Sequence, residues 1–212
     1  MRNAVLFFVA LFLGIAFMLV VKTYAVKSKP QLDARYENTS SFSLEKAPKN
    51  SLTGKIIDLS GDVALRPRTS TEAAKITTPR EIIQGESLNT TSGNATVQFQ
   101  NIADIKLSSN SELDFVQTLP SNFVFNQTKG IVEYNKIGEA PISARIMHLL
   151  VNQDSGSMLV AVNPEENIIT IDVLSGKITI AFNDLDYNSN VLEIFDDEKL
   201  IFNDLTREAE VE

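Results

Sequence analysis

Few residues of this 212-residue chain are of the kinds that carry out chemistry, because it has one histidine, no cysteine and no tryptophan. Without cysteine the chain can hold neither a disulfide framework nor a thiolate metal site, and one imidazole makes no histidine cluster. His148 alone could serve as a base or as a pH sensor. Because apolar residues surround it at positions 147, 149 and 150, we expect a histidine packed at the rim of a core.

One segment has the start of a metal-binding pattern. Asp184 to Asn190 open with the D-x-D-x-N spacing of a calcium loop. That loop needs glycine at its sixth position and glutamate at its twelfth, where this chain has Ser189 and Phe195. No flanking helices are indicated. We therefore interpret the segment as a polar hairpin loop between two strands, with calcium binding as the alternative.

The other polar residues form no recognisable catalytic pattern. The sequence contains no nucleophile elbow, no phosphate-binding loop, no HExxH and no carboxylate pair with a catalytic spacing. A serine–lysine pair is the one catalytic arrangement left open. We predict a protein that is not an enzyme, with no catalytic residues, no cofactor and no metal.

The net charge of −8 conceals two regions of opposite sign. Residues 1–50 contain seven Lys and Arg against three Asp and Glu, hence +4, whereas residues 51–212 contain twelve against twenty-four, hence −12. An acidic body disfavours the phosphate backbone of nucleic acid, so we predict no nucleic-acid partner. Ten acids lie within residues 184–212 beside Lys199 and Arg207. They could attract a basic partner, although we favour a solvated face that ends in an acidic tail, residues 206–212.

An uninterrupted apolar run near the amino terminus predicts a membrane helix. Residues 4–21 contain no charged or strongly polar side chain, and a helix of that length extends about 27 Å, enough to cross a hydrocarbon core. The alternative is a cleaved signal peptide with a poor cleavage site at residues 23–25. Because signal peptides have shorter apolar regions, we predict that residues 1–21 are an uncleaved membrane anchor.

Charge and size favour opposite orientations of this anchor. Four basic residues follow it within residues 22–35 and only Arg2 precedes it, which by the positive-inside rule would place the body in the cytoplasm. Large domains, however, cross the membrane largely regardless of charge. We predict a single-pass membrane protein with its amino terminus inside and an extracytoplasmic body. Residues 22–50, rich in Lys, Ser, Asn and Glu, form a flexible linker between the two.

From residue 51 onward the apolar residues recur with a period of two, which is typical of β-strands with one buried face. This alternation is present at residues 95–100, 104–107, 169–173 and 177–182, and Gly, Asn, Ser or Asp separates most such segments. About a dozen strands of ordinary length fit this part of the chain. The sequence therefore predicts an all-β body.

One segment fits two structures. Ile142, Ile146, Leu149 and Leu150 have the spacing of one helix face. Residues 142–151 therefore form either one or two helical turns or part of the sheet, and both alternatives stay open.

A short motif recurs three times and places glycine directly before an alternating strand. The copies are Leu-Ser-Gly-Asp-Val-Ala-Leu at residues 59–65, Thr-Lys-Gly-Ile-Val-Glu-Tyr at 128–134 and Leu-Ser-Gly-Lys-Ile-Thr-Ile at 174–180. Glycine there indicates a tight turn or a positive φ. Because the copies are unevenly spaced, we expect similar strand entries in a rolled or solenoid-like sheet rather than a regular repeat array.

In their order and spacing these segments resemble the extracytoplasmic domain of the FecR family, regulators named from ferric citrate transport. Gly61-Asp62-Val63 matches the family's opening Gly-x-Val strand, and residues 82–90 match its Leu/Ile-x-x-Gly-Asp-x-Ile/Leu-x-Thr turn. Later family segments correspond in order to residues 92–99, 105–107, 109–113, 130–132, 156–162 and 169–180. The chain departs from the family at Ser157, where threonine is usual. We take residues 51–205 as one FecR-like β domain.

The resemblance implies a compact, rolled β structure outside the cytoplasm and five structural turn glycines: Gly61, Gly85, Gly130, Gly156 and Gly176. The family's regulators carry a sigma-factor-controlling segment before the membrane helix, whereas three residues precede it here. We therefore expect a membrane-anchored protein-interaction or signalling module without that cytoplasmic segment. The alternative is an envelope-structural or cell-wall-glycan-binding protein, so the expected partner is an unidentified envelope protein or a glycan.

Overall fold

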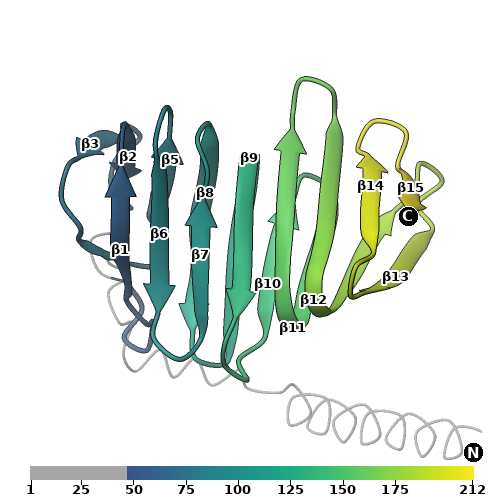
Figure 1. The fold of residues 1–212 in the computed structure, drawn as a ribbon, viewed down its shortest axis with the longest axis horizontal. Coiled ribbons are helices and arrows are strands. Elements are labelled where there is room, and N and C mark those ends of the chain that lie inside the picture. Colours follow the sequence, from purple (N-terminus) through teal and green to yellow (C-terminus); the bar gives the residue numbers. More distant parts are fainter. Residues whose placement is uncertain (1–46) are drawn as a thin grey trace, which may run out of the picture. The chain divides into compact units, whose positions relative to one another are not determined.

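The computed structural model describes residues 47–212, and in that part all regular secondary structure is β (Figure 1). The predicted all-β class is therefore confirmed. No helix within residues 47–212 has the length and hydropathy that a membrane crossing needs. The predicted anchor, residues 4–21, and the linker up to residue 46 lie outside the described residues.

Within residues 47–212, fifteen strands form one continuous sheet. The first eight are β1 (Gly54–Ser60), β2 (Val63–Arg66), β3 (Ala74–Ile76), β4 (Glu81–Ile82), β5 (Ser87–Thr90), β6 (Asn94–Phe99), β7 (Ala103–Leu107) and β8 (Ser111–Leu119). The others are β9 (Asn122–Lys136), β10 (Ile142–Ile146), β11 (Leu149–Asn163), β12 (Ile168–Asn183), β13 (Ser189–Phe195), β14 (Lys199–Asn203) and β15 (Glu208–Val211).

The sheet is folded over on itself into two layers, a front and a back layer as seen in Figure 1. The front layer runs in the order β4-β1-β6-β7-β9-β11-β12-β14-β15, and the back layer runs β3-β2-β5-β8-β9-β10-β11-β12-β13. All neighbours are antiparallel except β9 and β10, which are parallel. The sheet is open, because β3, β4, β13 and β15 each have one side without a neighbouring strand in the described part of the chain.

Three long strands belong to both layers because each bends at a glycine. In β9, residues before Gly130 pair with β8 and β10, and residues from Gly130 onward pair with β7 and β11. The strands β11 and β12 bend together, since Gly156 lies opposite Gly176 in their ladder. Both of these glycines have a positive φ, of 73° and 87°. A side chain on Gly156 would overlap the Ser175 carbonyl group, so two backbones meet there at a distance that only glycine permits.

Two glutamines hold these bends from inside the core. Gln127 and Gln153 each stand three residues before a bend glycine, and their amide groups donate to the carbonyl oxygens of Gly130 (2.9 Å) and Gly156 (2.7 Å). The buried Tyr134 hydroxyl donates to Gln127 Oε1 at 3.0 Å. Burial raises the pKa of Tyr134, so this phenol stays neutral and keeps its donor.

The core lies between the layers and is filled by the inward-facing residues of every alternating strand. Its centre is an aromatic cluster that joins Phe99 of the front layer to Phe115, Phe123 and Phe125 of the back layer, with ring centroids 5.1–6.3 Å apart. Burial of each ring contributes about 1.5–3 kcal/mol relative to an exposed ring. These contacts join the two layers through the core.

The structure settles the ambiguous segment and corrects one prediction. Residues 142–151 are not helical, because β10 and β11 form a hairpin whose turn contains Met147 with a φ of 50°. The buried positions are even-numbered before the turn and odd-numbered after it. Ile142, Ile146 and Leu149 are therefore all buried, at a spacing that resembles one face of a helix. Residues 206–212, which we predicted to be an acidic tail beyond the β domain, include β15, which pairs with β14 and belongs to the sheet.

Candidate functional site

A row of polar side chains crosses the outer face of the back layer. The ladder registers place Arg66 of β2 beside Ser87 of β5, Ser87 beside Asp114 of β8, and Asp114 beside Asn126 of β9. Arg145 of β10 continues the row beside Asn126. We call Arg66, Ser87, Asp114, Asn126 and Arg145 the polar row.

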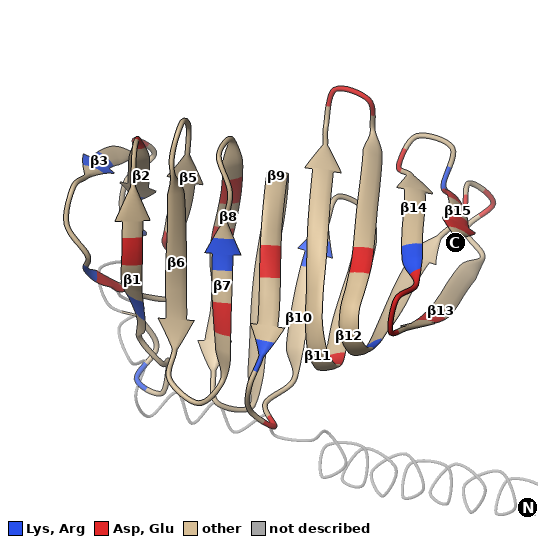
Figure 2. Ribbon diagram, viewed as in Figure 1, with Lys and Arg blue, Asp and Glu red and all other residues tan. Residues whose placement is uncertain are grey.

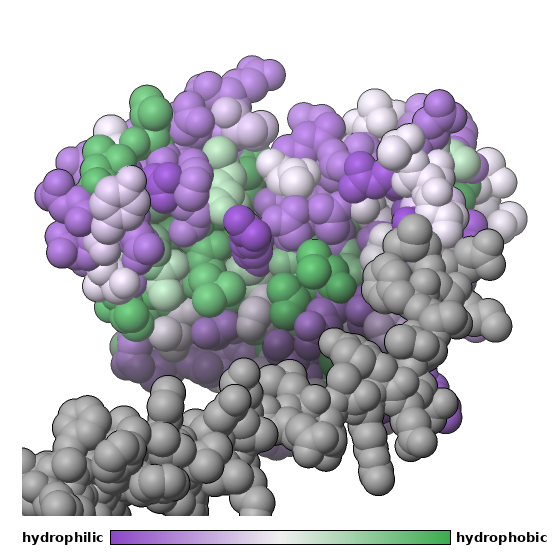
Figure 3. All heavy atoms as spheres, turned by 180° about the vertical axis from the view of Figure 1, so that it is seen from behind, coloured by the Kyte–Doolittle hydropathy of each residue, from purple (hydrophilic) through white to green (hydrophobic). Residues whose placement is uncertain are grey.

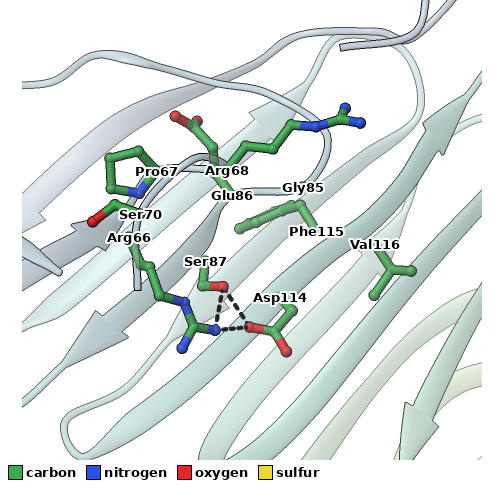
Figure 4. A pocket seen from close by; sticks show the side chains of 10 residues that line it. All are labelled: Arg66, Pro67, Arg68, Ser70, Gly85, Glu86, Ser87, Asp114, Phe115 and Val116. Atoms are coloured by element: carbon green, nitrogen blue, oxygen red, sulfur yellow. Dashed lines mark hydrogen bonds and ion pairs between the residues drawn. The ribbon is translucent and has the colours of Figure 1, made fainter. Parts of the chain in front are cut away.

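The first four members are joined by short hydrogen bonds. Figure 4 shows those among Arg66, Ser87 and Asp114. One terminal nitrogen of Arg66 donates to Ser87 Oγ at 2.7 Å and to Asp114 Oδ1 at 2.9 Å. The Ser87 hydroxyl donates to the same Asp114 oxygen at 2.5 Å, and the Asn126 amide donates to the other at 2.8 Å. Every bond in this network ends on the Asp114 carboxylate or on Ser87, so Asp114 is its central acceptor.

A shallow cavity of about 330 Å³ lies beside Arg66. Its lining includes Arg68, Gly85 and Glu86 from the β2–β5 region and Phe115 and Val116 from β8 (Figure 4). The lining supplies two guanidinium groups, two carboxylates and two hydroxyls beside Phe115 and Val116. Such a lining suits hydrogen bonding to polar groups of a partner. The Ser87 hydroxyl donates to the Asp114 carboxylate and accepts from the Arg66 guanidinium.

Glu86 of this cavity has a raised pKa. Its side chain is almost wholly buried, and burial raises the pKa of the carboxyl group. The Ile83 backbone N–H donates to Glu86 Oε2 at 2.8 Å, and this bond and the charge of Arg80 act in the opposite direction on the pKa. The cavity therefore contains an acid whose charge is disfavoured by its surroundings.

His148 has a partner that the sequence did not indicate. Its Nδ1 atom lies 2.9 Å from both carboxylate oxygens of Asp204, and the His148 backbone N–H donates to Asp204 Oδ1 at 3.1 Å. The Asp204 side chain is 7% exposed and the imidazole 55% exposed. This pair connects the β10–β11 turn of the back layer to the β14–β15 turn of the front layer. The imidazole is exposed at a turn and pairs with a carboxylate, so it does not pack against the apolar residues that flank it in the sequence.

The segment with the start of a calcium pattern is a hairpin turn between β12 and β13, as the favoured interpretation predicts. Asp184 accepts from the backbone N–H groups of Asp186 (2.9 Å) and Asn188 (2.8 Å) and from the Asn188 side chain (3.1 Å). The backbone N–H of Asn188 is the main cause of a lowered pKa for this carboxyl group. Asp184 thus stabilises its own turn. Within residues 47–212 no group of three or more His, Asp or Glu side chains has an arrangement that could hold a metal ion.

Of the five turn glycines named from the sequence, one lies in the candidate site. Gly85 lines the cavity, whereas Gly61 connects β1 to β2 and the other three form the bends of the long strands. All five have a positive φ. Gly156, at the bend of β11, also lines a separate cavity of about 380 Å³.

The polar row itself was missed by sequence reasoning. Its members are outward residues of separate strands, and Arg66 and Asp114 are 48 residues apart. The sequence showed only that each alternating segment has a polar residue at a position expected to face outward. Without the strand register, nothing in the sequence places these residues side by side.

The outer face of the front layer carries charged residues of both signs along several strands. Figure 2 shows acidic and basic residues along β7, β9, β12 and β14, and Lys106 donates to Glu133 at 2.8 Å across two of these strands. Exposed pairs of this sort contribute about 0–1 kcal/mol each. This face has the character of a solvated surface, and the back layer is the better candidate for recognition.

Comparison with known proteins identifies the fold. No family model matches the chain, and no curated protein matches it. Two crystal structures of a putative anti-sigma factor from Parabacteroides distasonis match it with 15% and 14% sequence identity and a TM-score of 0.52 in each case. Each match covers 59% of this chain and 58% of the crystallised chain, so it extends over little more than half of that protein. The chain therefore shares its β fold with part of that protein.

Proposed function

We propose that this chain is a FecR-type signalling module whose rolled β domain binds another protein. The observation that carries the proposal is the fold that 59% of this chain shares with part of a protein described as a putative anti-sigma factor. The order of the glycine-strand segments along the sequence, from Gly61 to Gly176, supports the same assignment. In this proposal residues 4–21 anchor the chain in the membrane and the β domain lies outside the cytoplasm.

The outer surfaces of the β domain support binding better than catalysis. The polar row offers donors and acceptors on a rigid sheet, because each member is fixed by the strand that carries it. The four sheet edges add unpaired backbone groups, which can bind an extended segment of a partner. The proposed partner is an envelope protein.

Crosslinking in intact cells tests the proposal. The full-length chain is treated with a mild amine-reactive crosslinker, solubilised in detergent and recovered, and its adducts are identified by mass spectrometry. A recurrent adduct with one envelope protein is expected, and recovery of the chain alone would contradict the proposal. Protease treatment of intact cells checks the orientation, since an extracytoplasmic β domain is cleaved without lysis.

Binding to cell-wall glycan is the alternative, and the cavity beside Arg66 gives it a specific test. The full-length chain is sedimented with purified cell wall, next to the variants Asp114→Ala and Asp172→Ala. Asp114 is the central acceptor of the polar row, whereas Asp172 lies on the front layer and is a matched control. Retention that is lost only in Asp114→Ala would favour the glycan alternative, and no retention is expected of a protein-binding module.

A further inference from the structure

The longest unprotected edge of the sheet is β13. The other edge strands are short, with β3, β4 and β15 comprising three, two and four residues, whereas β13 has seven. It pairs with β12 through seven consecutive residues without a bulge. The strand contains neither proline nor lysine, and those two residues, like bulges and short length, are the usual means by which proteins protect an edge from pairing.

The hydrogen-bond pattern shows which backbone groups of β13 face outward. The Asp184 N–H donates to the Asn188 carbonyl at 3.0 Å, so the bonded pairs between β12 and β13 involve the even-numbered residues of β13. The N–H and C=O groups of Ser189, Val191 and Glu193 consequently point away from β12. At Phe195 the Glu198 side chain accepts the backbone N–H at 2.8 Å, so the open stretch ends at Glu193.

The side chains along this edge combine apolar and acidic character. Val191 is 63% exposed and Phe195 48% exposed, and both lie on the outer face of the back layer. Figure 3 shows apolar surface at the side of the domain that carries β13. Between them stands Glu193, and the turns at the two ends of β13 carry these acids: Asp184, Asp186, Asp196, Asp197 and Glu198.

Charge decides what this edge binds. A second copy of the chain would bring the same acids against one another, and like charges oppose such an interface. Because residues two apart in a strand lie on the same face, an extended segment with alternating apolar and basic residues would place its apolar residues beside Leu192 and Ile194 on the inner face. Its basic residues would then lie on the outer face, beside Glu193 and the acidic turns. Main-chain pairing supplies affinity in this mode, and the alternating side chains supply specificity.

We propose that β13 binds an extended, basic segment of the partner as an added antiparallel strand. This inference rests on the proposed function, because it names the surface and the chemistry through which the β domain recognises a protein. It assigns the contact to one edge and excludes β15, whose free backbone groups lie at Ala209 and Val211.

A designed peptide and two matched variants test the inference. The probe is a seven-residue peptide of alternating lysine and valine, compared with a peptide of alternating glutamate and valine. Binding to the full-length chain in mild detergent is measured by titration calorimetry. The variants are Val191→Pro and Val211→Pro. Each removes one outward N–H from an edge strand and leaves the bonded side of that strand intact, a substitution that edge strands tolerate.

The expected results differ between the two edges. Val191→Pro lowers the affinity for the lysine peptide about tenfold, because it removes one backbone donor and its ring obstructs the added strand, whereas Val211→Pro leaves the affinity unchanged. The glutamate peptide does not bind, and raising the salt concentration from about 0.05 to 0.5 M weakens binding of the lysine peptide. Equal affinity in all three proteins, loss only in Val211→Pro, or no binding of the lysine peptide would overturn the inference.

Hydrogen exchange on the unmodified chain keeps the test independent of how the variants fold. Adding the lysine peptide is expected to slow exchange at Val191 and Glu193 and to leave Ala209 and Val211 unchanged. Slow exchange at Val191 that depends on protein concentration without peptide would mean pairing of two copies and would overturn the inference. The crosslinking experiment stays separate: an envelope partner that still forms adducts with Val191→Pro contradicts the β13 assignment and leaves the proposed function standing.

Discussion

Replacing Gly156 by alanine tests whether the bend of β11 and β12 depends on the close approach of two backbones. The residue has a φ of 73°, and an alanine methyl group would overlap the Ser175 carbonyl and lie 2.8 Å from the Gly176 nitrogen. The left-handed conformation alone costs an alanine about 1–2 kcal/mol. Relief of the overlap requires the two strands to separate, with loss of one or two ladder hydrogen bonds at about 0.5–1.5 kcal/mol each. The total loss of folding free energy is about 3 kcal/mol.

Gly85→Ala is the matched control for this experiment. Gly85 also has a positive φ, of 88°, but an added methyl group meets the Arg68 side chain at 3.0 Å, and that side chain can move. Gly85→Ala is therefore expected to lose only the folding free energy that the left-handed conformation costs, about 1–2 kcal/mol. Urea unfolding followed by circular dichroism measures both variants. If Gly156→Ala loses no more free energy of unfolding than Gly85→Ala, the close approach at the bend does not constrain the fold.

Three further outcomes follow from the core and from the candidate site. Phe125→Ala is expected to lower the free energy of unfolding by about 3–5 kcal/mol in urea titrations, because its ring touches four aromatic neighbours; a loss below 1 kcal/mol would contradict the packing. Asp114→Ala leaves the Arg66 guanidinium and Ser87 without their shared acceptor and should cost about 1–2 kcal/mol, with a smaller loss in Asp114→Asn; equal losses would refute the role of the charge. Glu86 has a raised pKa in the folded state, so its contribution is fully present below the unfolded pKa of about 4.3 and is lost as the pH rises through the folded pKa. The free energy of unfolding of the wild type, relative to Glu86→Gln, should therefore decrease as the pH rises above 4, and an increase would contradict the burial of this acid.

The period-two pattern was sufficient to predict the class of the fold, because each buried strand places alternate apolar residues in the core. It was insufficient for residues 142–151, where a turn at Met147 brings Ile142, Ile146 and Leu149 to the same side. A helix and a hairpin with a short turn give the same spacing over so few residues. Only the pairing of β10 with β9 and β11 separates the two.

The contacts of the candidate site could not be derived from the sequence for a different reason. His148 and Asp204 are 56 residues apart, and their contact depends on how two turns from different layers meet. The members of the polar row depend on strand register in the same way. Local residue patterns determine which face of a strand a side chain lies on, whereas the register between strands determines its neighbours.

The bent strands have a consequence for how the molecule comes apart. Because β9, β11 and β12 each continue from one layer into the other, neither layer is an independent unit of folding. Unfolding of the back layer disrupts the same strands that form the centre of the front layer. We expect unfolding to be a single cooperative transition. A partner that adds a strand to β13 would then stabilise the whole domain, since β13 is attached to β12 and β12 takes part in both layers.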